Sequence, residues 1–558
     1  MSDDTKKVPP KDALHARLKA ELKNAATSPE TGSAGEQAQR GQSDAGDDGK
    51  GQKTGIDQIR QIMEGAGQPA LLDENNDNVP MQPGEYDEDP GNDTGSGAPV
   101  PQDWGYSLEK MNAEWSLVLI GSKVAMVREQ PHAKEEDRVR VVQLESFHKL
   151  YSNRPTQVLA SDGKIKTVTW SKRWEGERHR RQFDGIEFFP SPDGASGTRG
   201  YLNLWQGFSY TPNATAGSWS IFKDHILTNI CNEDPDLFNW VFGWFAHMMQ
   251  SPRERPGTAL VIRGLMGTGK SIMGEVMGSL IAPHFFQVDD PRYITGQFNA
   301  HMSACLLLQA EEAVWAGDKV AEGRLKGLIT SKTQMIESKG VDPYRLDNFV
   351  RIQMTSNEDW VVPAGKDERR YCVLDCAPNA KENHGYFGEM MAELDSGGRQ
   401  ALLADLLAFD LSAINLRQIP RTGALLQQKL RSLDSVDQFM FERLYEGTLL
   451  KADASWNPDA FVIKQTLYDE YLTAADKVGI KRRADLNQFG KSIAKLIPGL
   501  KDIRPRDGAT RKRAYVFPDL AVCRQGFEEA VGQAVDWPTD ALDLTGTDPE
   551  NPFERETG

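Results

Sequence analysis

The sequence predicts an α/β core that follows an N-terminal α+β region and precedes a helix-rich C-terminal module. Three observations carry this prediction. A glycine-rich loop at 264–271 joins an apolar, partly β-branched run at 258–263 to apolar side chains that recur at helical spacing. Strand patterns at 115–120 and 123–127 flank Gly121-Ser122, which indicates a β-hairpin. Toward the C-terminus, helical patterns precede two short strand patterns around a basic turn.

Length and charge narrow the class of protein. A chain of 558 residues is too long for one ordinary domain. The net charge of −16 alone argues against nucleic-acid binding, but no Lys or Arg occurs between Arg60 and Lys110, so the acidic charge is local. The five cysteines form no C-x-x-C pair, and we find no secretory signal and no apolar run that could span a membrane. We therefore expect a cytoplasmic protein without a membrane partner.

Composition divides the chain into segments. Residues 1–100 are poor in apolar side chains, which predicts a disordered acidic tail, although a helix-like patch at 56–63 leaves partner binding open. We predict a β-rich accessory domain at 104–200, a helical domain at 201–255 and an α/β domain at 256–415. A C-terminal module at 430–535 and an acidic tail at 536–558 complete the chain.

Two basic regions are candidate DNA contacts. In the accessory domain, Trp170 and Trp174 alternate with Lys and Arg, which suits either stacking on a single strand or a solvated surface face. In the C-terminal module, helical patterns around 468–475 and 486–496 precede strands on either side of Arg511, Lys512 and Arg513. This order predicts a winged-helix-like module, which either lays a helix in a DNA groove or serves as a packing module.

The glycine-rich loop fits the phosphate-binding pattern G-x-x-x-x-G-K-[ST]. Its backbone N–H groups can surround phosphates at the start of a helix. Lys270 can reach the β- and γ-phosphates of ATP, and the Ser271 hydroxyl can ligate Mg²⁺. The nucleotide-binding residues that we predict are Gly264, Gly267, Thr268, Gly269, Lys270 and Ser271.

Two later strands end in polar side chains that complete an ATPase site. The apolar run at 305–310 leads into Glu311 and Glu312, a pattern typical of a Walker B element. One carboxylate, assigned to Glu311, can hold Mg²⁺, and the other can polarise the attacking water. The strand pattern at 350–356 ends at Asn357, whose amide can orient that water.

A pair of arginines follows this amide. Arg369 and Arg370 can reach the γ-phosphate held by a neighbouring subunit and stabilise transition-state charge. One member of the pair can instead form a surface salt bridge.

The ordered set resembles the superfamily 3 helicases, and in particular the helicase part of phage and plasmid primase-helicases. The matching pieces are 264–271, 306–312, 350–357 and Arg369-Arg370. The stretch 325–331 followed by 337–340 is similar to that family's motif before a DNA-contacting hairpin, which would place Lys339 on DNA. An ordinary helix and turn is the alternative. The chain departs from the family in having Glu311 where Asp is common, and we identify no primase or polymerase motif in its N-terminal half.

The resemblance implies an AAA+-like ATPase core. It also implies a ring, with a hexamer expected, that binds ATP between its subunits. Such a ring would translocate on single-stranded and forked DNA. The N-terminal tail would then be available to replication partners. Two other classes stay open at this point. One is another ring-forming DNA motor, such as a packaging ATPase. The other is an origin-binding or scaffold protein whose nucleotide controls assembly only.

Overall fold

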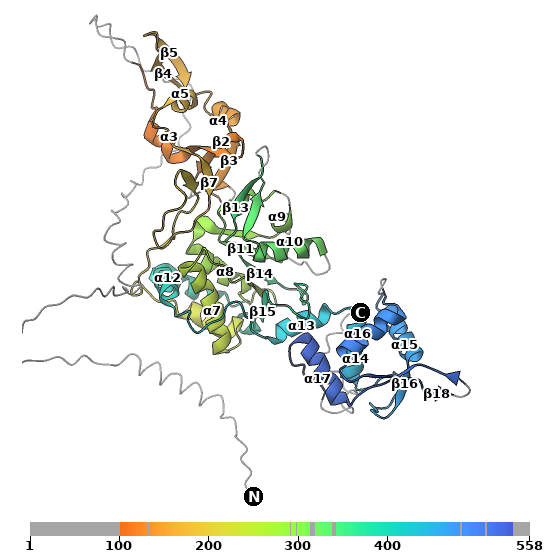
Figure 1. Ribbon diagram of the computed structural model, residues 1–558. Helices are drawn as coiled ribbons and strands as arrows, with labels where there is room; N and C mark the ends of the chain where they lie inside the picture. The colour runs from red at the N-terminus through yellow and green to blue at the C-terminus, as the bar shows by residue number, and fades with distance from the viewer. Residues whose placement is uncertain are drawn as a thin grey trace, which may run out of the picture. The chain divides into compact units, whose positions relative to one another are not determined.

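A five-stranded parallel sheet is the largest sheet of the computed structural model (Figure 1). The structure describes residues 101–130, 133–134, 137–290, 292–296, 298–312, 319–337, 342–479, 483–507 and 510–538. The predicted tail at 1–100, most of the predicted tail at 536–558, and Lys339 lie outside these ranges. Within them, no helix is both long and apolar enough to cross a membrane.

The central strands of this sheet are buried on both faces. The spatial order of the strands in the sheet is β10 (Phe285–Val288), β11 (Leu307–Glu311), β14 (Arg351–Ser356), β9 (Ala259–Arg263) and β15 (Tyr371–Asp375), and every neighbouring pair is parallel. All of β9 and all of β14 are buried. Burial on both faces explains why β9 and β15 read mostly as apolar runs in the sequence, whereas β14 also buries the polar side chains of Arg351, Gln353 and Thr355. The prediction of an α/β core is confirmed at the level of a parallel sheet with covering helices.

Helix α8 (Lys270–Ser279) lies directly on the sheet, because two glycines leave room for the strands. A Cβ atom on Gly274 would lie 1.9 Å from Gln309 Oε1, and one on Gly278 would lie 2.3 Å from Phe285 Cγ. The remaining elements between β9 and β15 are the short helices at Ala282–His284 and Ala300–Ala304, α9 (Arg292–Thr295), α10 (Lys319–Thr330), and the antiparallel hairpin of β12 (Thr333–Ile336) and β13 (Tyr344–Asp347).

Helices before and after the sheet share its apolar core. They are α6 (Ser220–His225), a π-helical turn at Ile226–Ile230, α7 (Pro235–Gln250), a 3₁₀ turn at Pro378–Ala380, α11 (His384–Glu393), a kink at Leu394–Gly398 and α12 (Arg399–Ala408). Trp219, Phe242 and Trp244 belong to the same buried cluster as Leu260 and Val373 of the sheet. The helices predicted at 201–255 therefore pack as part of the sheet's own core.

The N-terminal region contains a four-stranded sheet in the order β3-β2-β1-β6. The predicted hairpin is confirmed, since Ile120 of β1 pairs with Lys123 of β2 across Gly121-Ser122. The elements are α3 (Leu108–Glu114), β1 (Trp115–Ile120), β2 (Lys123–Glu129), β3 (Val139–Gln143), α4 (Leu144–Leu150), β4 (Pro155–Leu159), β5 (Ile165–Thr169), α5 (Trp170–Gly176), β6 (Gln182–Phe183), β7 (Gly185–Glu187) and β8 (Tyr201–Asn203).

The idea that Trp174 stacks on a nucleic acid is wrong. Its side chain is fully buried, and its indole N–H donates to Asn112 Oδ1 at 2.8 Å. The neighbouring Arg173 lies 4.2 Å from the centre of the Tyr106 ring and pairs with Asp103. The alternation of Trp with Lys and Arg in the sequence does not by itself indicate that Trp174 faces the core.

The C-terminal module has its own apolar core. Its elements are α13 (Gly423–Arg431), α14 (Ser435–Glu446), β16 (Phe461–Ile463), α15 (Lys464–Lys477), α16 (Leu486–Leu496), β17 (Lys501–Ile503), β18 (Arg506–Asp507), β19 (Thr510–Arg511), β20 (Ala514–Val516) and α17 (Leu520–Val531). The sheet order is β16-β20-β17, and β18 pairs with β19 as a hairpin between β17 and β20. Both predicted helices and the strands around the basic turn are confirmed as elements.

We expect acid to destabilise the fold through His284, which is wholly buried. Its Nδ1 lies 2.9 Å from Ala304 O, and its Nε2 accepts from Gln206 N at 3.0 Å, so both ring nitrogens are satisfied by the neutral ring. Burial lowers the pKa of His284 from 6.5 to about 4. The unfolded chain therefore binds the proton first as the pH falls.

The contribution of His284 to stability is complete above pH 6.5 and is lost toward pH 4, a decrease of about 3 kcal/mol in the free energy of unfolding. Urea unfolding at a series of pH values measures this decrease. His284→Gln removes the titrating ring, so its curve should be flatter than that of the wild type. Equal slopes in the two proteins would contradict the assignment.

Candidate functional site

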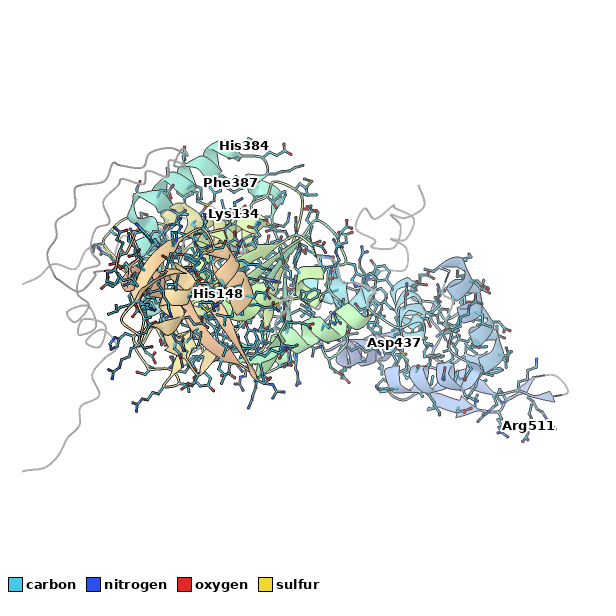
Figure 2. The ribbon with its side chains drawn as sticks, turned by 90° about the horizontal axis from the view of Figure 1, so that it is seen from above. Lys134, His148, His384, Phe387, Asp437 and Arg511 are labelled. Carbon is cyan, nitrogen blue, oxygen red and sulfur yellow. The ribbon has the colours of Figure 1, made fainter. Side chains whose placement is uncertain are left out.

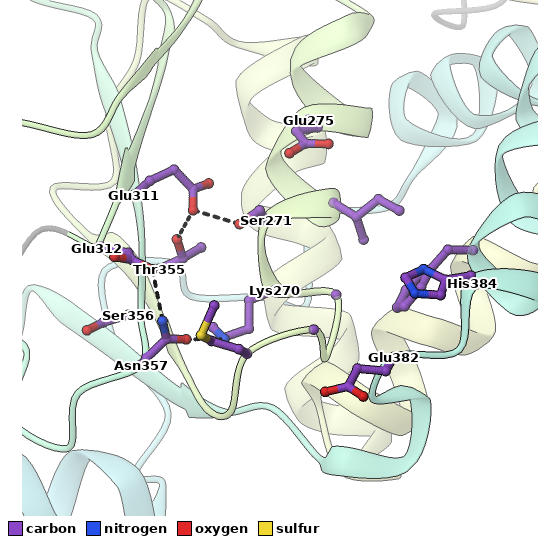
Figure 3. Close-up of a pocket in the computed structure, with 15 residues that line it drawn as sticks. Lys270, Ser271, Glu275, Glu311, Glu312, Thr355, Ser356, Asn357, Glu382 and His384 are labelled. Atoms are coloured by element: carbon purple, nitrogen blue, oxygen red, sulfur yellow. Dashed lines mark hydrogen bonds between the residues drawn. The ribbon is translucent and has the colours of Figure 1, made fainter.

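The predicted loop, the carboxylates and the amide meet at one edge of the parallel sheet. The loop follows β9, Glu311 ends β11 and is followed by Glu312, and Asn357 follows β14. Since the carboxyl ends of parallel strands lie at the same edge, this is where an open α/β sheet binds ligands. A cavity of about 370 Å³ opens there, lined by the loop and by all three polar residues (Figure 3).

Three glycines give the loop its shape. Gly264, Gly267 and Gly269 have φ values of 148°, 73° and 87°, a region that side-chain-bearing residues rarely adopt. Space is restricted as well, because a Cβ atom on Gly264 would lie 3.0 Å from Cys376 O. The predicted glycine positions are therefore required by both conformation and close packing.

Three consecutive carbonyl groups of the loop are held from outside. Gly267 O accepts from Glu382 N at 3.0 Å, Thr268 O lies 3.6 Å from Cys376 Sγ, and Gly269 O lies 3.2 Å from His225 Nε2. In a planar trans peptide the N–H points opposite to the C=O. The next three N–H groups, from Thr268 to Lys270, therefore point to the other side of the loop. That arrangement is suited to binding an anion at the start of a helix.

Lys270 lies in the cavity wall with only 7% of its surface exposed. Its ammonium donates to Gly264 O at 2.9 Å, Leu265 O at 2.6 Å and Asn357 Oδ1 at 2.9 Å. All three acceptors are neutral, and burial lowers the pKa of Lys270. A cation with neutral partners in a concave site is a binding point for an anionic ligand.

Glu311 joins the loop helix to the strands. Its Oε2 accepts hydrogen bonds from Ser271 Oγ at 2.7 Å and from Thr355 Oγ1 at 2.6 Å (Figure 3). Carboxylate and hydroxyl oxygens are ligands that Mg²⁺ prefers, and it usually takes one or two carboxylates plus substrate phosphates. The oxygens of Ser271 and Glu311 thus fit the magnesium ion that the sequence predicts. No cluster of three or more His, Cys, Asp or Glu suited to a metal occurs among the described residues.

Glu312 has a strained backbone. Its φ is 48°, which costs of order 1–3 kcal/mol for a residue other than glycine. Successive side chains of a strand point to opposite faces, but Glu311 and Glu312 both line the same cavity. Glu312 Oε1 accepts from Asn357 Nδ2 at 2.9 Å. The left-handed turn therefore brings a second carboxylate to the site and pairs it with the predicted amide.

Arg369 and Arg370 do not line this cavity. They precede β15 at its amino end, whereas the cavity lies at the carboxyl ends of the strands. Arg370 pairs with Glu368 at 2.9 Å, as expected if one of the two forms a salt bridge. Arg369 is exposed. Neither guanidinium serves the site of its own chain, which leaves a role toward a second subunit as a prediction.

Several residues of the cavity were not predicted from sequence. Thr355 lies near the end of β14, two residues before Asn357, so alternation continued from the strand was a usable signal. Glu275 follows Ser271 by one helical turn, and although it is exposed, desolvation by the cavity wall and the nearby charge of Glu311 raise its pKa. Glu382, His384 and Phe387 come from the segment that begins α11, more than 100 residues after the loop, and no local pattern indicates them.

The predicted basic residues of the C-terminal module form a separate surface. Arg511, Lys512 and Arg513 are exposed, and Arg511 lies on the β18–β19 hairpin (Figure 2). Arg511 pairs in register with Arg506 on β18, so the two arginine side chains leave the hairpin on the same face. Arg513 lies 3.4 Å from Asp502.

One family model matches the region of the chain that contains the site. The sequence model of a protein family described as a family of unknown function (DUF5906) matches residues 262–370. These residues include the loop, both glutamates, Asn357 and both arginines. A DNA primase-polymerase of Nitratiruptor phage NrS-1 is 25% identical over 197 residues, which are 35% of this chain and 27% of that protein. The chain thus matches little more than a quarter of the length of that relative.

Solved structures share the fold. The apo structure of the NrS-1 C-terminal region has a TM-score of 0.51 at 17% identity and covers 74% of this chain and 97% of that one. The A form of the same region has a TM-score of 0.52 at 16% identity, with 74% and 99% covered. At these identities the likeness shows a common fold.

Proposed function

We propose that this chain is an ATP-driven DNA helicase of phage or plasmid replication, of the superfamily 3 type, that works as a ring. One observation carries the proposal: Lys270, Ser271, Glu311, Glu312 and Asn357 line a single cavity together with residues of the glycine-rich loop. The relation to a phage DNA primase-polymerase supports a role in phage replication. The strand order, with β14 between β9 and β11, supports an AAA+-like ATPase core because it brings Asn357 between the loop and the carboxylates.

The residues divide the reaction between them. The N–H groups of the loop hold the phosphates of ATP, and Lys270 exchanges its carbonyl partners for phosphate oxygens as the nucleotide enters. Mg²⁺, held by Ser271 and Glu311, would neutralise charge on the phosphates. Glu312 polarises the attacking water, and Asn357, already paired with Glu312, orients it.

We do not propose primer synthesis for this chain. The chain matches 27% of the primase-polymerase, and its N-terminal half shows no primase or polymerase motif. The proposed partners are single-stranded and forked DNA and further copies of the chain, with a hexamer expected.

Strand displacement tests the function. The purified chain should separate a forked duplex in the presence of ATP and Mg²⁺, and single-stranded DNA should stimulate its ATPase activity, while Lys270→Ala should do neither. Stimulation by duplex DNA without displacement would favour a packaging motor instead. Nucleotide binding without steady turnover would favour a scaffold or origin-binding protein.

A mixing experiment tests the shared site. If Arg369 acts on the γ-phosphate of a neighbouring subunit, Arg369→Ala alone should lose most ATPase activity. Mixed with Lys270→Ala, it should recover part of that activity, because some interfaces then combine an intact Lys270 with an intact Arg369. Arg370→Ala is the comparison, since Arg370 is already paired with Glu368. Absence of recovery in rings shown to contain both variants would contradict a shared site.

Neutralising the hairpin should weaken DNA loading. With Arg511, Lys512 and Arg513 all changed to alanine, the slope of log K against log salt for duplex DNA should become shallower by up to about 3, because each lost phosphate contact removes roughly 0.9. The ATPase rate without DNA should not change, since these residues lie outside the cavity. Alanines at exposed Lys110, Lys123 and Lys149 provide a control of equal charge. An unchanged slope in the hairpin variant would exclude the hairpin from DNA binding.

A further inference from the structure

A buried histidine lies behind the glycine-rich loop. His225 ends α6, has no exposed surface, and places its Nε2 3.2 Å from Gly269 O. The rings of Tyr386 and Phe387 pack around it, with centroids 5.9 Å and 5.7 Å away. His225 does not itself line the cavity. It therefore contacts the loop without entering the cavity.

The hydrogen bonds of His225 define its tautomer. A carbonyl oxygen only accepts, so the bond to Gly269 O requires the proton on Nε2. Nδ1 is then an acceptor, and Asn229 Nδ2 donates to it at 3.1 Å. Burial lowers the pKa of His225, which favours this neutral form. Asn229 thus keeps the donating nitrogen of His225 directed at the loop.

A π-helical turn holds both side chains in place. His225 precedes the turn at Ile226–Ile230, and Asn229 lies within it. Such turns occur often at functional sites. Asn229 O accepts from Ala377 N at 2.7 Å, and Asn232 Nδ2 donates to Asp375 O at 2.8 Å. The turn is thereby attached to the carboxyl end of β15, the edge at which the cavity opens.

The loop has no room to move toward His225. A Cβ atom on Gly269 would lie 2.7 Å from His225 Cε1 and 2.7 Å from Phe387 Cε1. Because the Gly269 carbonyl is directed at His225, the N–H of Lys270 in the same peptide points the opposite way. The orientation of this N–H therefore depends on a side chain that comes from a helix well before the loop in sequence.

We propose that His225 is a positioning residue for the phosphate-binding loop: it holds the Gly269–Lys270 peptide in the orientation that turns the Lys270 N–H toward the phosphates of ATP. This rests on the proposed function, since it assumes that the loop binds a nucleoside triphosphate. His225 acts only through the loop and contacts no reacting atom. Asn229 supports it by selecting the tautomer.

Two substitutions of similar size distinguish loss of the Nε2–H hydrogen bond from loss of side-chain packing. Glutamine can place its amide N–H near the position of Nε2, whereas the shorter asparagine reproduces only Nδ1. His225→Asn should weaken binding of the non-hydrolysable analogue adenylyl imidodiphosphate by about three- to tenfold, the usual size of one lost hydrogen bond. KM for ATP should rise by the same factor with kcat nearly unchanged, because the contact is made equally in the ground and transition states. His225→Gln should restore most of the affinity.

Thr228→Ala, in the same π-helical turn, is the matched control and should bind like the wild type. Thermal unfolding of each variant shows whether it folds. If His225→Asn does not fold, Asn229→Ala provides the test, with an expected two- to threefold loss of affinity from the unselected tautomer. Equal affinities of the Asn and Gln variants, or of Asn229→Ala and the wild type, would overturn the inference.

The failure of this inference is distinguishable from failure of the proposed function. If the wild type binds the analogue and Lys270→Ala does not, the nucleotide site stands whatever His225 does. If the wild type and Lys270→Ala both fail to bind it, the nucleotide site itself is wrong, and the role of His225 falls with it.

Discussion

Replacing Lys270 with alanine is expected to lower the rate of ATP hydrolysis by at least about 100-fold, the usual effect of removing one group that stabilises transition-state charge. The Lys270 ammonium has only neutral partners, two loop carbonyls and the Asn357 amide oxygen. It can therefore be released to phosphate oxygens without breaking an ion pair. Steady-state phosphate release from the purified chain measures the effect.

A second buried lysine provides a control that distinguishes loss of the ATPase site from loss of folding stability. Lys429 donates to Val531 O at 2.8 Å and does not line the cavity. Lys429→Ala should lower the melting temperature but keep the turnover of the folded protein. If Lys270→Ala hydrolyses ATP at the wild-type rate, the cavity is not the ATPase site.

Glu312→Gln should separate binding from hydrolysis. The substitution keeps the size of the side chain but removes the charge that polarises water, so turnover should decrease by about 100-fold. ATP affinity should change by less than about threefold, because Lys270, Ser271 and the loop N–H groups remain in place. Equilibrium binding and single-turnover hydrolysis measure the two quantities separately.

Glu358 offers a control close to the same strand end. It is exposed, follows Asn357 directly and does not line the cavity, so Glu358→Gln should leave both binding and turnover unchanged. Should Glu312→Gln bind ATP poorly and hydrolyse what it binds at the normal rate, Glu312 would be a ligand for the nucleotide and not the residue that activates water.

The sequence by itself determined the pieces of the site. An apolar run, a glycine-rich loop and a helical pattern are local features, so their spacing was enough to identify Lys270 and Ser271. Glu311, Glu312 and Asn357 were predictable for the same reason, since each stands where a buried strand ends. The hairpin at Gly121-Ser122 and the helix at Leu486–Leu496 also follow from short-range patterns.

The tertiary structure alone decided how these pieces meet. Parallel strands pair over long separations in sequence, and the place of β14 between β9 and β11 depends on which faces are buried together. The pairing of Glu312 with Asn357 and the burial of Trp174 also depend on segments that are distant in sequence. The same holds for His225, which comes from a helix before the loop, and for Cys376 and Glu382, which lie in one segment about 100 residues after it; all three contact the loop carbonyls. The contacts of these residues with the loop carbonyls have no local sequence signal, because only folding brings the residues beside the loop.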